Sequence, residues 1–351
     1  MSRMSRSHIA VLLAIGAIVP VQSLVSRPGV AETLGNGQAD GFAAIGISDS
    51  DAGSARATAI GGIAIGPESF ALTKDATHPC AGGSDATDCG HGNIAIGISS
   101  GATNDFAVAV GFLSKAAGLN SSAYGPNSAS PGQGSSAFGA NANAVGNGSV
   151  AAGSSATANG LISIAIGFSS SAADAAVALG SQANARANNS IAMGQGSAAT
   201  GTRSFAAGTS VNSAGNDSIA IGTKASTFNA NNKGGGDSAV AVGNSALASA
   251  RHSTAVGVSA KAEADSSSAY GNSSSAPASI AQGSSSSAYG NASIANGSNS
   301  SAFGNASIAN ANNSTAVGSK ARANGITSAA FGVTPPQVAT TVWLWVTTHR
   351  P

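Results

Sequence analysis

A glycine that recurs every 14 residues constrains this chain more than any other feature of its sequence. Each of these glycines ends a motif of the type Ser-Ile-Ala-Ile-Gly, and between Gly97 and Gly222 the spacing is 14 residues with a single step of 13. After a step of 21 residues the series resumes at Gly243, and it reaches Gly332. Further glycines fall midway between these positions, for example Gly118. The pattern predicts two short strands joined by two tight turns in each repeat.

One such unit is too small to bury its apolar side chains by itself, so neighbouring units must stack to form a core. At the usual strand spacing of about 4.8 Å they would form a continuous parallel β-solenoid. A helical fold is excluded because each glycine in a helix interior costs about 1 kcal/mol relative to alanine. The sequence therefore predicts an all-β fold made of 14-residue coils.

The position two residues before each of these glycines is always alanine, as in Ala95, Ala165 and Ala302. The half-repeats have Ala or Ser at the matching position, such as Ala116 and Ser130. Because side chains alternate between the two faces of a strand, these residues can all point inward. We therefore expect a thin core that is filled mainly with methyl groups.

The residues that flank this alanine must then face outward, and in the first half of each coil they are mostly apolar. In the second half the same places are mostly polar. An exposed apolar row along a whole rod indicates an interface, and rotational symmetry between identical rods would close it. The predicted interface residues are Ile94, Ile96, Val108, Val110, Ile164, Ile166, Ile191, Met193, Ile219 and Ile221.

Aromatic residues occupy the same outward row in some coils, and they could fill the oligomer axis or stack on a ligand. They are Tyr124, Phe138, Tyr270, Tyr289 and Phe303. Between Gly271 and Gly318 the two halves of the repeat become more alike, since Ile294 and Ile308 appear in the second half. We expect a weaker register and a looser interface there.

Composition removes several classes of function. Charged residues make up 8% of the chain, whereas about 25% is usual for a soluble domain. The formal net charge is only +1, which gives no electrostatic case for binding nucleic acid. No serine has a histidine and a carboxylate in a catalytic motif, so we expect neither an enzyme nor a cofactor.

The two ends of the chain depart from the repeat. Residues 1–23 have a basic start and an eleven-residue apolar run, Ile9 to Val19, which is typical of a signal peptide and predicts export. Residues 24–34 are expected to be a linker. Residues 333–351 contain both tryptophans and do not follow the repeat, so we interpret them as an unstructured tail or as the product of a shifted reading frame.

The two cysteines, Cys80 and Cys89, lie in an irregular insertion at residues 67–93. In an exported chain this pair predicts a disulfide. A Cys/His metal site with the nearby histidines and a pair of free thiols remain alternatives, although Cys-x8-Cys is not a usual zinc spacing.

Four motifs of the form Asn-Ser-x-Ala-x-Gly give the chain a family resemblance. They are NSSAYG (120–125), NSIAMG (189–194), NSSAFG (299–304) and NSTAVG (313–318). With the period of 14, they resemble the YadA-like head of trimeric autotransporter adhesins over about residues 35–332. The resemblance implies a left-handed parallel β-roll, a homotrimer and display on the surface of a Gram-negative cell.

The family resemblance also implies partners: collagen or another extracellular-matrix protein, or sister cells in autoagglutination. Contact with a membrane would come only through a C-terminal anchor, for which we find no matching segment in this sequence. The resemblance makes the polar residues of the four motifs candidates for ligand binding, namely Asn120, Ser121, Asn189, Ser190, Asn299, Ser300, Asn313 and Ser314.

Other functions fit the sequence less well. An ice-binding solenoid needs a regular row of threonines, and threonine is sporadic here. A polysaccharide lyase on a β-solenoid needs charged residues in register over neighbouring coils, and we see none. A truncated adhesin remnant without function is the remaining alternative.

Overall fold

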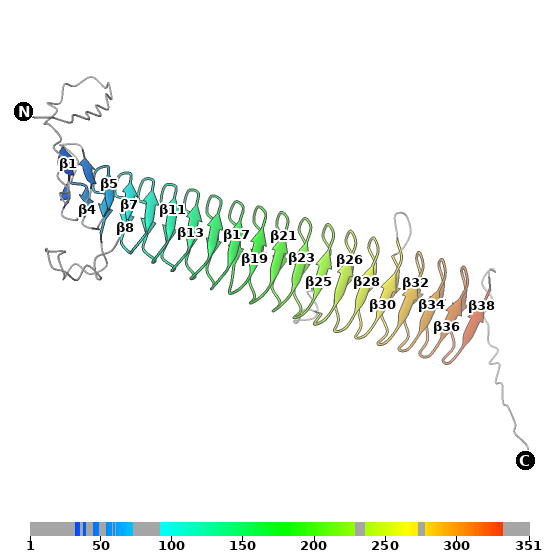
Figure 1. Cartoon of the computed structure of the whole chain (residues 1–351). Coiled ribbons are helices and arrows are strands. Elements are labelled where there is room, and N and C mark those ends of the chain that lie inside the picture. Colours follow the sequence, from blue (N-terminus) through cyan, green and yellow to red (C-terminus); the bar gives the residue numbers. More distant parts are fainter. Residues whose placement is uncertain are drawn as a thin grey trace, which may run out of the picture.

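The computed structural model of the chain is a rod of stacked coils, whose strands follow one another in chain order from end to end (Figure 1). It describes residues 32–35, 38–39, 45–48, 54–57, 59, 61–72, 92–228, 236–272 and 278–332. Each regular coil contributes a three-residue strand to one sheet and a two-residue strand to a second sheet. We call these sheet A and sheet B.

Sheet A has 20 parallel strands. Their bounds are β1 Glu32–Gly35, β3 Ile45–Ser48, β5 Ile63–Ile65, β7 Ile94–Ile96, β9 Val108–Val110, β11 Ser122–Tyr124, β13 Ser136–Phe138, β15 Val150–Ala152, β17 Ile164–Ile166, β19 Val177–Leu179, β21 Ile191–Met193, β23 Phe205–Ala207, β25 Ile219–Ile221, β26 Val240–Val242, β28 Thr254–Val256, β30 Ser268–Tyr270, β32 Ser287–Tyr289, β34 Ser301–Phe303, β36 Thr315–Val317 and β38 Ala329–Phe331.

Sheet B consists of a 12-stranded part and a 6-stranded part. The first comprises β2 Gln38–Ala39, β4 Arg56–Ala57, β6 Phe70–Ala71, β8 Gly101–Ala102, β10 Lys115–Ala116, β12 Ala129–Ser130, β14 Asn143–Ala144, β16 Thr157–Ala158, β18 Ser171–Ala172, β20 Asn184–Ala185, β22 Ala198–Ala199 and β24 Asn212–Ser213. The second comprises β27 Leu247–Ala248, β29 Lys261–Ala262, β31 Ile280–Ala281, β33 Ile294–Ala295, β35 Ile308–Ala309 and β37 Arg322–Ala323.

Neighbouring coils pair residue for residue. In β17 and β19, for example, Ala165 lies opposite Ala178, and the Ile164 N–H donates to the carbonyl of Ala176 at 2.9 Å. The same parallel register continues from β5 to β38 in sheet A. It also holds between β5 and β7, between β25 and β26, and between β30 and β32, where the sequence departs from the 14-residue repeat. The predicted all-β solenoid of 14-residue coils is confirmed.

Four small residues of each coil fill the core. In the coil that ends at Gly167 they are Ala156, Ala158, Ser163 and Ala165, all with no exposed surface. Ala158 and Ala165 occupy the two positions predicted to point inward, and their burial confirms that prediction. The other two inward rows, which hold mostly Ala or Ser and in places a larger residue such as Val211, are not part of the prediction.

At many inward positions serine can take the place of alanine because its hydroxyl finds a backbone partner, whereas in the described part of the chain seven serine hydroxyls are buried without one, those of Ser130, Ser135, Ser149, Ser204, Ser249, Ser286 and Ser300. The Ser163 Oγ donates to the carbonyl of Gly160, three residues earlier, at 2.7 Å. The same bond, at 2.6–3.0 Å, recurs at Ser69, Ser100, Ser114, Ser128, Ser170, Ser190, Ser197, Ser218, Ser253, Ser293, Ser307 and Ser314. A buried hydroxyl that is hydrogen-bonded in this way avoids the penalty of an unpaired polar group.

The repeating glycine is required both by its backbone angle and by the close stacking of coils. Gly139 has a φ of +124°, and a Cβ atom there would lie 2.9 Å from the carbonyl oxygen of Gly153 in the next coil. Gly304 has a φ of +127°, with the Gly318 carbonyl oxygen at 2.7 Å from the same hypothetical atom. Any side chain would therefore both strain the backbone and push two coils apart.

Each turn places one residue in the left-handed region, two residues after the glycine position. Asparagine is often found there, as at Asn127 (φ 55°), but so is the β-branched Ile162 (φ 52°). Isoleucine disfavours this conformation intrinsically. The stacked register, rather than local preference, therefore holds such turns in place.

Toward the N-terminal end the strand pairing extends beyond the expected segment boundaries. Strand β1 pairs with β3, so pairing begins inside the expected linker at residues 24–34. Strand β6 lies within the predicted insertion 67–93 and pairs with β8, so this coil continues to Leu72 and the rod resumes at Gly92. The predicted signal peptide at residues 1–23, both cysteines and residues 333–351 lie outside the described residues.

Candidate functional site

The outer face of sheet A carries two rows of side chains, which come from the first and third residues of each strand. From β7 to β38 we call these rows the apolar stripe. All ten residues predicted to form an interface lie in the stripe, and they are half-buried or exposed in the single chain. Ile166, for example, exposes 43% of its surface, and Met193 exposes 39%. Apolar side chains exposed in a continuous row are characteristic of a surface that is covered by a partner.

The size of the two outward residues varies from strand to strand of the stripe. Strand β17 carries two isoleucines, whereas β13 combines Ser136 with Phe138, and β23 combines Phe205 with Ala207. No strand of the stripe carries two aromatic residues, and β15, with valine and alanine, has the smallest pair.

The aromatic residues of the stripe stack on one another from coil to coil. Tyr270, Tyr289 and Phe303 form a stack with ring centroids 4.8 and 5.2 Å apart. Tyr124 and Phe138 form a second stack at 5.3 Å, with their planes 3° apart. Because the ring faces are used within the stacks, only ring edges point away from the rod. This geometry suits packing against another apolar surface better than stacking on a ligand.

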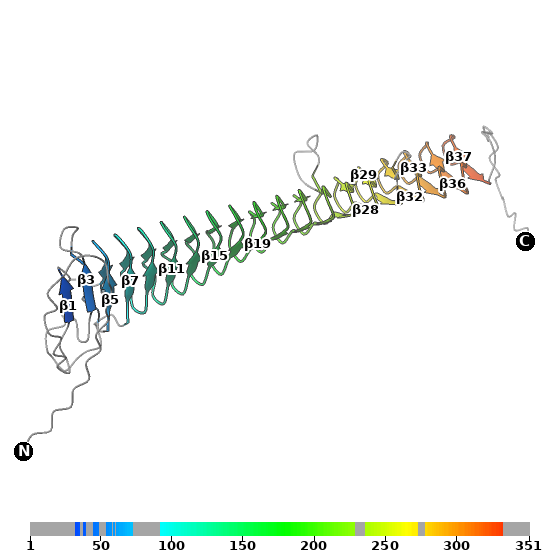
Figure 2. The ribbon, with the colours of Figure 1, turned by 90° about the horizontal axis from the view of Figure 1, so that it is seen from above.

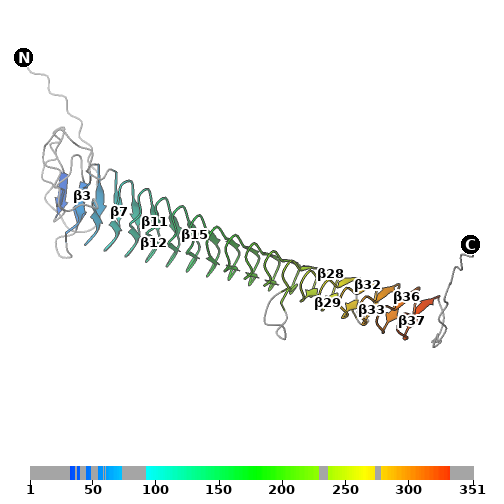
Figure 3. The same cartoon turned by 90° about the horizontal axis from the view of Figure 1, so that it is seen from below.

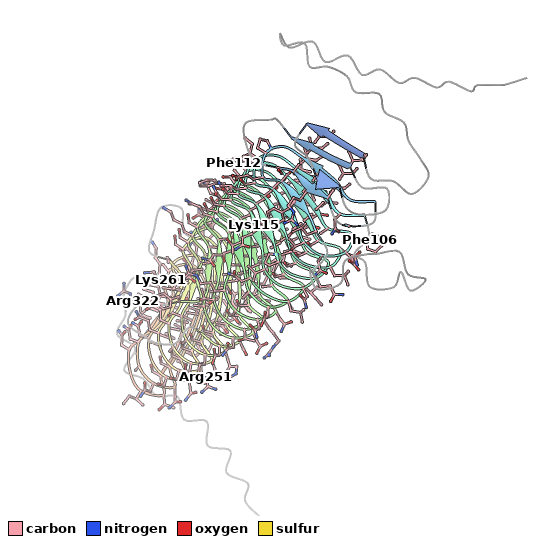
Figure 4. All side chains as sticks on the ribbon, turned by 90° about the vertical axis from the view of Figure 1, so that its left-hand side faces the viewer. Phe106, Phe112, Lys115, Arg251, Lys261 and Arg322 are labelled. Atoms are coloured by element: carbon pink, nitrogen blue, oxygen red, sulfur yellow. The ribbon has the colours of Figure 1, made fainter. Side chains whose placement is uncertain are left out.

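The rod has two edges, which are formed by its turns. The first-turn edge leads from sheet A to sheet B and includes Phe112, and the second-turn edge leads back to sheet A and includes Phe106. Figure 4 shows these two residues on opposite sides of the rod. Lys115, Lys261 and Arg322, which share one outward row of sheet B, follow one another along it.

The eight motif residues predicted to bind a ligand divide into two groups. Asn120, Asn189, Asn299 and Asn313 are exposed on the second-turn edge with φ between 56° and 58°. Ser121, Ser190, Ser300 and Ser314 have no exposed surface, because they form one of the inward rows. The serines are therefore core residues and not ligand contacts, which corrects this part of the prediction. Only the asparagines can reach a ligand.

A further set of polar side chains holds the second-turn edge together. The Asn147 Oδ1 accepts a hydrogen bond from the Gln133 N–H of the preceding coil at 2.9 Å, and the Asp174 Oδ1 accepts one from Leu161 at 3.0 Å. The same bond is made by Asn216, Asp237, Asp265 and Asn312. Sequence reasoning missed these residues, although the recurrence of Asn or Asp directly after the half-repeat position is a visible signal.

An amide ladder runs along the outer face of sheet B near its C-terminal end. The Asn296 Nδ2 donates to the Asn310 Oδ1 at 2.9 Å, and the Asn310 Nδ2 donates to the Asn324 Oδ1 at 2.7 Å. Each bond joins two neighbouring coils. The ladder therefore adds side-chain pairing to the backbone pairing of β33, β35 and β37.

One ion pair joins two coils on the second-turn edge. The Arg203 Nε lies 2.6 Å from the Asp217 Oδ1, and the Arg203 Nη2 lies 2.7 Å from the Asp217 Oδ2. The hydrogen bond from Arg203 lowers the pKa of the Asp217 carboxyl below its ordinary value. Both side chains are exposed, so the pair contributes little to stability.

The described residues contain no group of three or more His, Cys, Asp or Glu side chains arranged to hold a metal ion. Within the same part of the chain, no helical segment has the length and hydropathy that crossing a bilayer requires. The candidate functional surfaces are thus the apolar stripe, the polar face of sheet B and the asparagine row of the second-turn edge.

Comparison with protein families gives one match. The model of the YadA head domain repeat (2 copies) matches residues 94–114, 102–128, 130–156, 144–170, 171–197, 188–210, 199–225, 235–257, 248–274, 275–300 and 295–321. Together these matches span more than half of the chain. No curated protein matches this sequence.

Proposed function

Because the chain belongs to the YadA head family, a family of surface-exposed bacterial adhesin domains, we propose that it forms the head of a trimeric adhesin. In this head three copies would pack their apolar stripes around a common axis. The remaining faces would attach the cell to extracellular-matrix proteins such as collagen, or to sister cells. The family is non-enzymatic, and we propose the same for this chain.

The observation that carries the proposal is the apolar stripe itself. Burying one Val or Ile side chain contributes about 1.5–3 kcal/mol, so a rod that exposes many of them to water is unfavourable as a monomer. When three copies are related by one rotation axis, every stripe is covered by the other copies. No stripe is then left free to bind a further copy.

Sheet B, which such a trimer leaves outside, carries mostly small or polar outward residues from β8 to β24. In the N-terminal coils the outward row of sheet B carries Asn143, Thr157, Ser171 and Asn184. Together with the asparagines of the second-turn edge, these amides and hydroxyls offer hydrogen bonds to a backbone-rich ligand. Single contacts of this kind are weak, and many adhesin copies on one cell would supply avidity.

Assembly is tested by analytical ultracentrifugation of the purified full chain. We expect a trimer mass for the wild type, and dissociation for the Ile164→Lys/Ile166→Lys variant, because charged side chains cannot be buried unpaired. Thr157→Lys on sheet B is the matched control and should remain trimeric. A folded monomeric wild type contradicts the proposal.

Attachment is tested with the same proteins on immobilised collagen and with beads that carry the chain. We expect retention on collagen or mutual agglutination of the beads, and reduced binding for an Asn120→Ala/Asn189→Ala/Asn299→Ala/Asn313→Ala variant of unchanged mass. Ser121→Ala serves as the control because this side chain is buried. A trimer that neither binds collagen nor agglutinates beads contradicts the adhesive function.

A further inference from the structure

In the C-terminal coils a second row of large apolar side chains lies on sheet B. The first residues of β31, β33 and β35 are Ile280, Ile294 and Ile308, and they pair directly from coil to coil. They point outward and are half-buried. From β8 to β24 the same row consists of small or polar residues, such as Thr157 and Ser171.

The same C-terminal coils lose one row of the apolar stripe. The first residues of β28, β30, β32, β34 and β36 are threonines or serines, so sheet A keeps only the row that contains Tyr270, Tyr289 and Phe303. This aromatic row lies directly before the first turn, and the isoleucine row lies directly after it. Between Tyr289 and Ile294 there are only four residues, among them the buried Ala292. The apolar surface has therefore moved from the centre of sheet A to the first-turn edge.

The two rows match each other in number and spacing. Each of three neighbouring coils contributes one aromatic residue to one side of the first-turn edge and one isoleucine to the other side. A partner that meets both rows must repeat with the same rise per coil, and a second copy of this chain does so. In a ring of three copies, each copy must also present two different surfaces to its two neighbours.

The twist of the rod explains why the contact surface moves. Stacked strands rotate relative to one another, so a straight assembly axis faces a different side of each coil along the rod. Toward the C-terminal end the sheet B strands β29, β33 and β37 come into view beside β28, β32 and β36 of sheet A, from above in Figure 2 and from below in Figure 3. The isoleucine row ends at a cationic residue on each side, Lys261 in β29 and Arg322 in β37. An apolar contact along this row is therefore limited to the coils between these two residues.

We propose that in the coils between Lys261 and Arg322 the aromatic row of one copy packs against the isoleucine row of the next copy. This contact rests on the trimer proposed above, but it differs from a contact in which identical rows meet at the axis. It identifies the first-turn edge of the C-terminal coils as a second subunit interface.

The test uses two chains with one cysteine each, Tyr289→Cys and Ile294→Cys, in a background in which Cys80 and Cys89 are replaced by serine. Co-expressed with different tags and treated with a short bis-maleimide, they should form a covalent dimer that contains both tags. Each variant expressed alone should give at least about tenfold less dimer. The matched N-terminal pair, Ile166→Cys with Ser171→Cys, should give no dimer that contains both tags.

The outcomes separate the two proposals. A trimeric mass with no dimer from the C-terminal pair, or with equal dimer from either variant alone, overturns the interface but leaves the trimer intact. A monomeric wild type overturns both. As a second measure, Ile294→Ser/Ile308→Ser should weaken trimer association about tenfold or more, whereas Thr157→Ser/Ser171→Ala should leave it unchanged. Circular dichroism of every variant checks that the coils still form.

Discussion

The coils from β7 to β25 and those from β26 to β38 have the same interior and different exteriors. Both regions have inward rows of alanine and serine, and both stack glycine on glycine. Outside, the first region concentrates apolar side chains on sheet A, and the second divides them between sheet A and sheet B. The inward residues thus specify the shape of the coil. The outward residues can vary from coil to coil according to the surface that each coil contacts.

The comparison also corrects an expectation about register. The similarity of the two half-repeats near the C-terminal end led us to expect weaker register there, yet β30, β32 and β34 pair residue for residue, as do β31, β33 and β35. The reason lies inside the rod. Ala281, Ala295 and Ala309 remain fully buried, and a shift by one residue would bring isoleucine into space that holds only a methyl group.

The largest expected effect tests what the two regions share. Gly139→Ala in the first region and Gly304→Ala in the second should each lower the free energy of unfolding by about 3 kcal/mol, because both the backbone angle and the stacking oppose a side chain. Urea unfolding followed by circular dichroism measures the change.

Gly148→Ala is the control for these two variants. This glycine has a φ of +66°, but the nearest atom to an added Cβ is 3.8 Å away, so only the backbone strain of about 1 kcal/mol remains. If Gly139→Ala and Gly304→Ala differed strongly from each other, the two regions would not have the same interior.

A smaller effect distinguishes the aromatic stacks of the two regions. Tyr289→Ala removes two ring contacts and should cost about 1–2 kcal/mol, whereas Tyr124→Ala removes one and should cost about half as much. Thermal unfolding isolates this difference when it is measured at a protein concentration too low for the chains to assemble. Equal losses would mean that stacking within the chain contributes nothing measurable.

The amide ladder is specific to the second region and predicts a difference of lower magnitude. Asn310→Ala breaks two side-chain hydrogen bonds and should cost roughly 1 kcal/mol. Asn159 occupies the matching outward position in the first region, without a side-chain partner among the described residues. Asn159→Ala should therefore leave hydrogen exchange in its coil unchanged, and comparable protection losses in both variants would contradict a role for the ladder.

The smallest effect concerns the ion pair of the first region. Since the pKa of Asp217 is lowered in the folded chain, its stabilising contribution is present above the ordinary carboxyl pKa of about 4 and is lost as the pH falls through the lowered value. Asp217→Asn should remove this pH dependence and change the melting temperature little at pH 7. A melting curve that responds equally to acid in the variant and the wild type would show that other carboxyl groups dominate.

Much of the fold can be predicted from the sequence because the glycine series and the alanine before each glycine have direct physical meaning. The outward position of Ile164 and Ile166 follows from simple alternation along a strand. The role of Ser121 and its equivalents does not follow as readily, since a serine in a recurring motif can equally be a ligand contact or a core residue. Only the burial of the side chain decides between them, and at Ser121 the buried Oγ accepts a hydrogen bond from the Gly118 N–H at 3.1 Å.

The turns were the least predictable part. Ile162 adopts a left-handed conformation that its side chain disfavours, and nothing local in the sequence indicates this. Likewise, the bond from Asp174 to the preceding coil depends on two residues that come together only after stacking. Features that arise between coils, and not within them, are the ones that sequence reasoning misses.

The one-to-one register has a consequence for how such a protein can change over generations. Deleting or duplicating one regular 14-residue coil leaves its neighbours with equivalent coils above and below, so the length of the rod changes in steps of about 4.8 Å without redesign of the fold. The distance at which the molecule touches its target is then a matter of copy number, which recombination between near-identical segments can adjust.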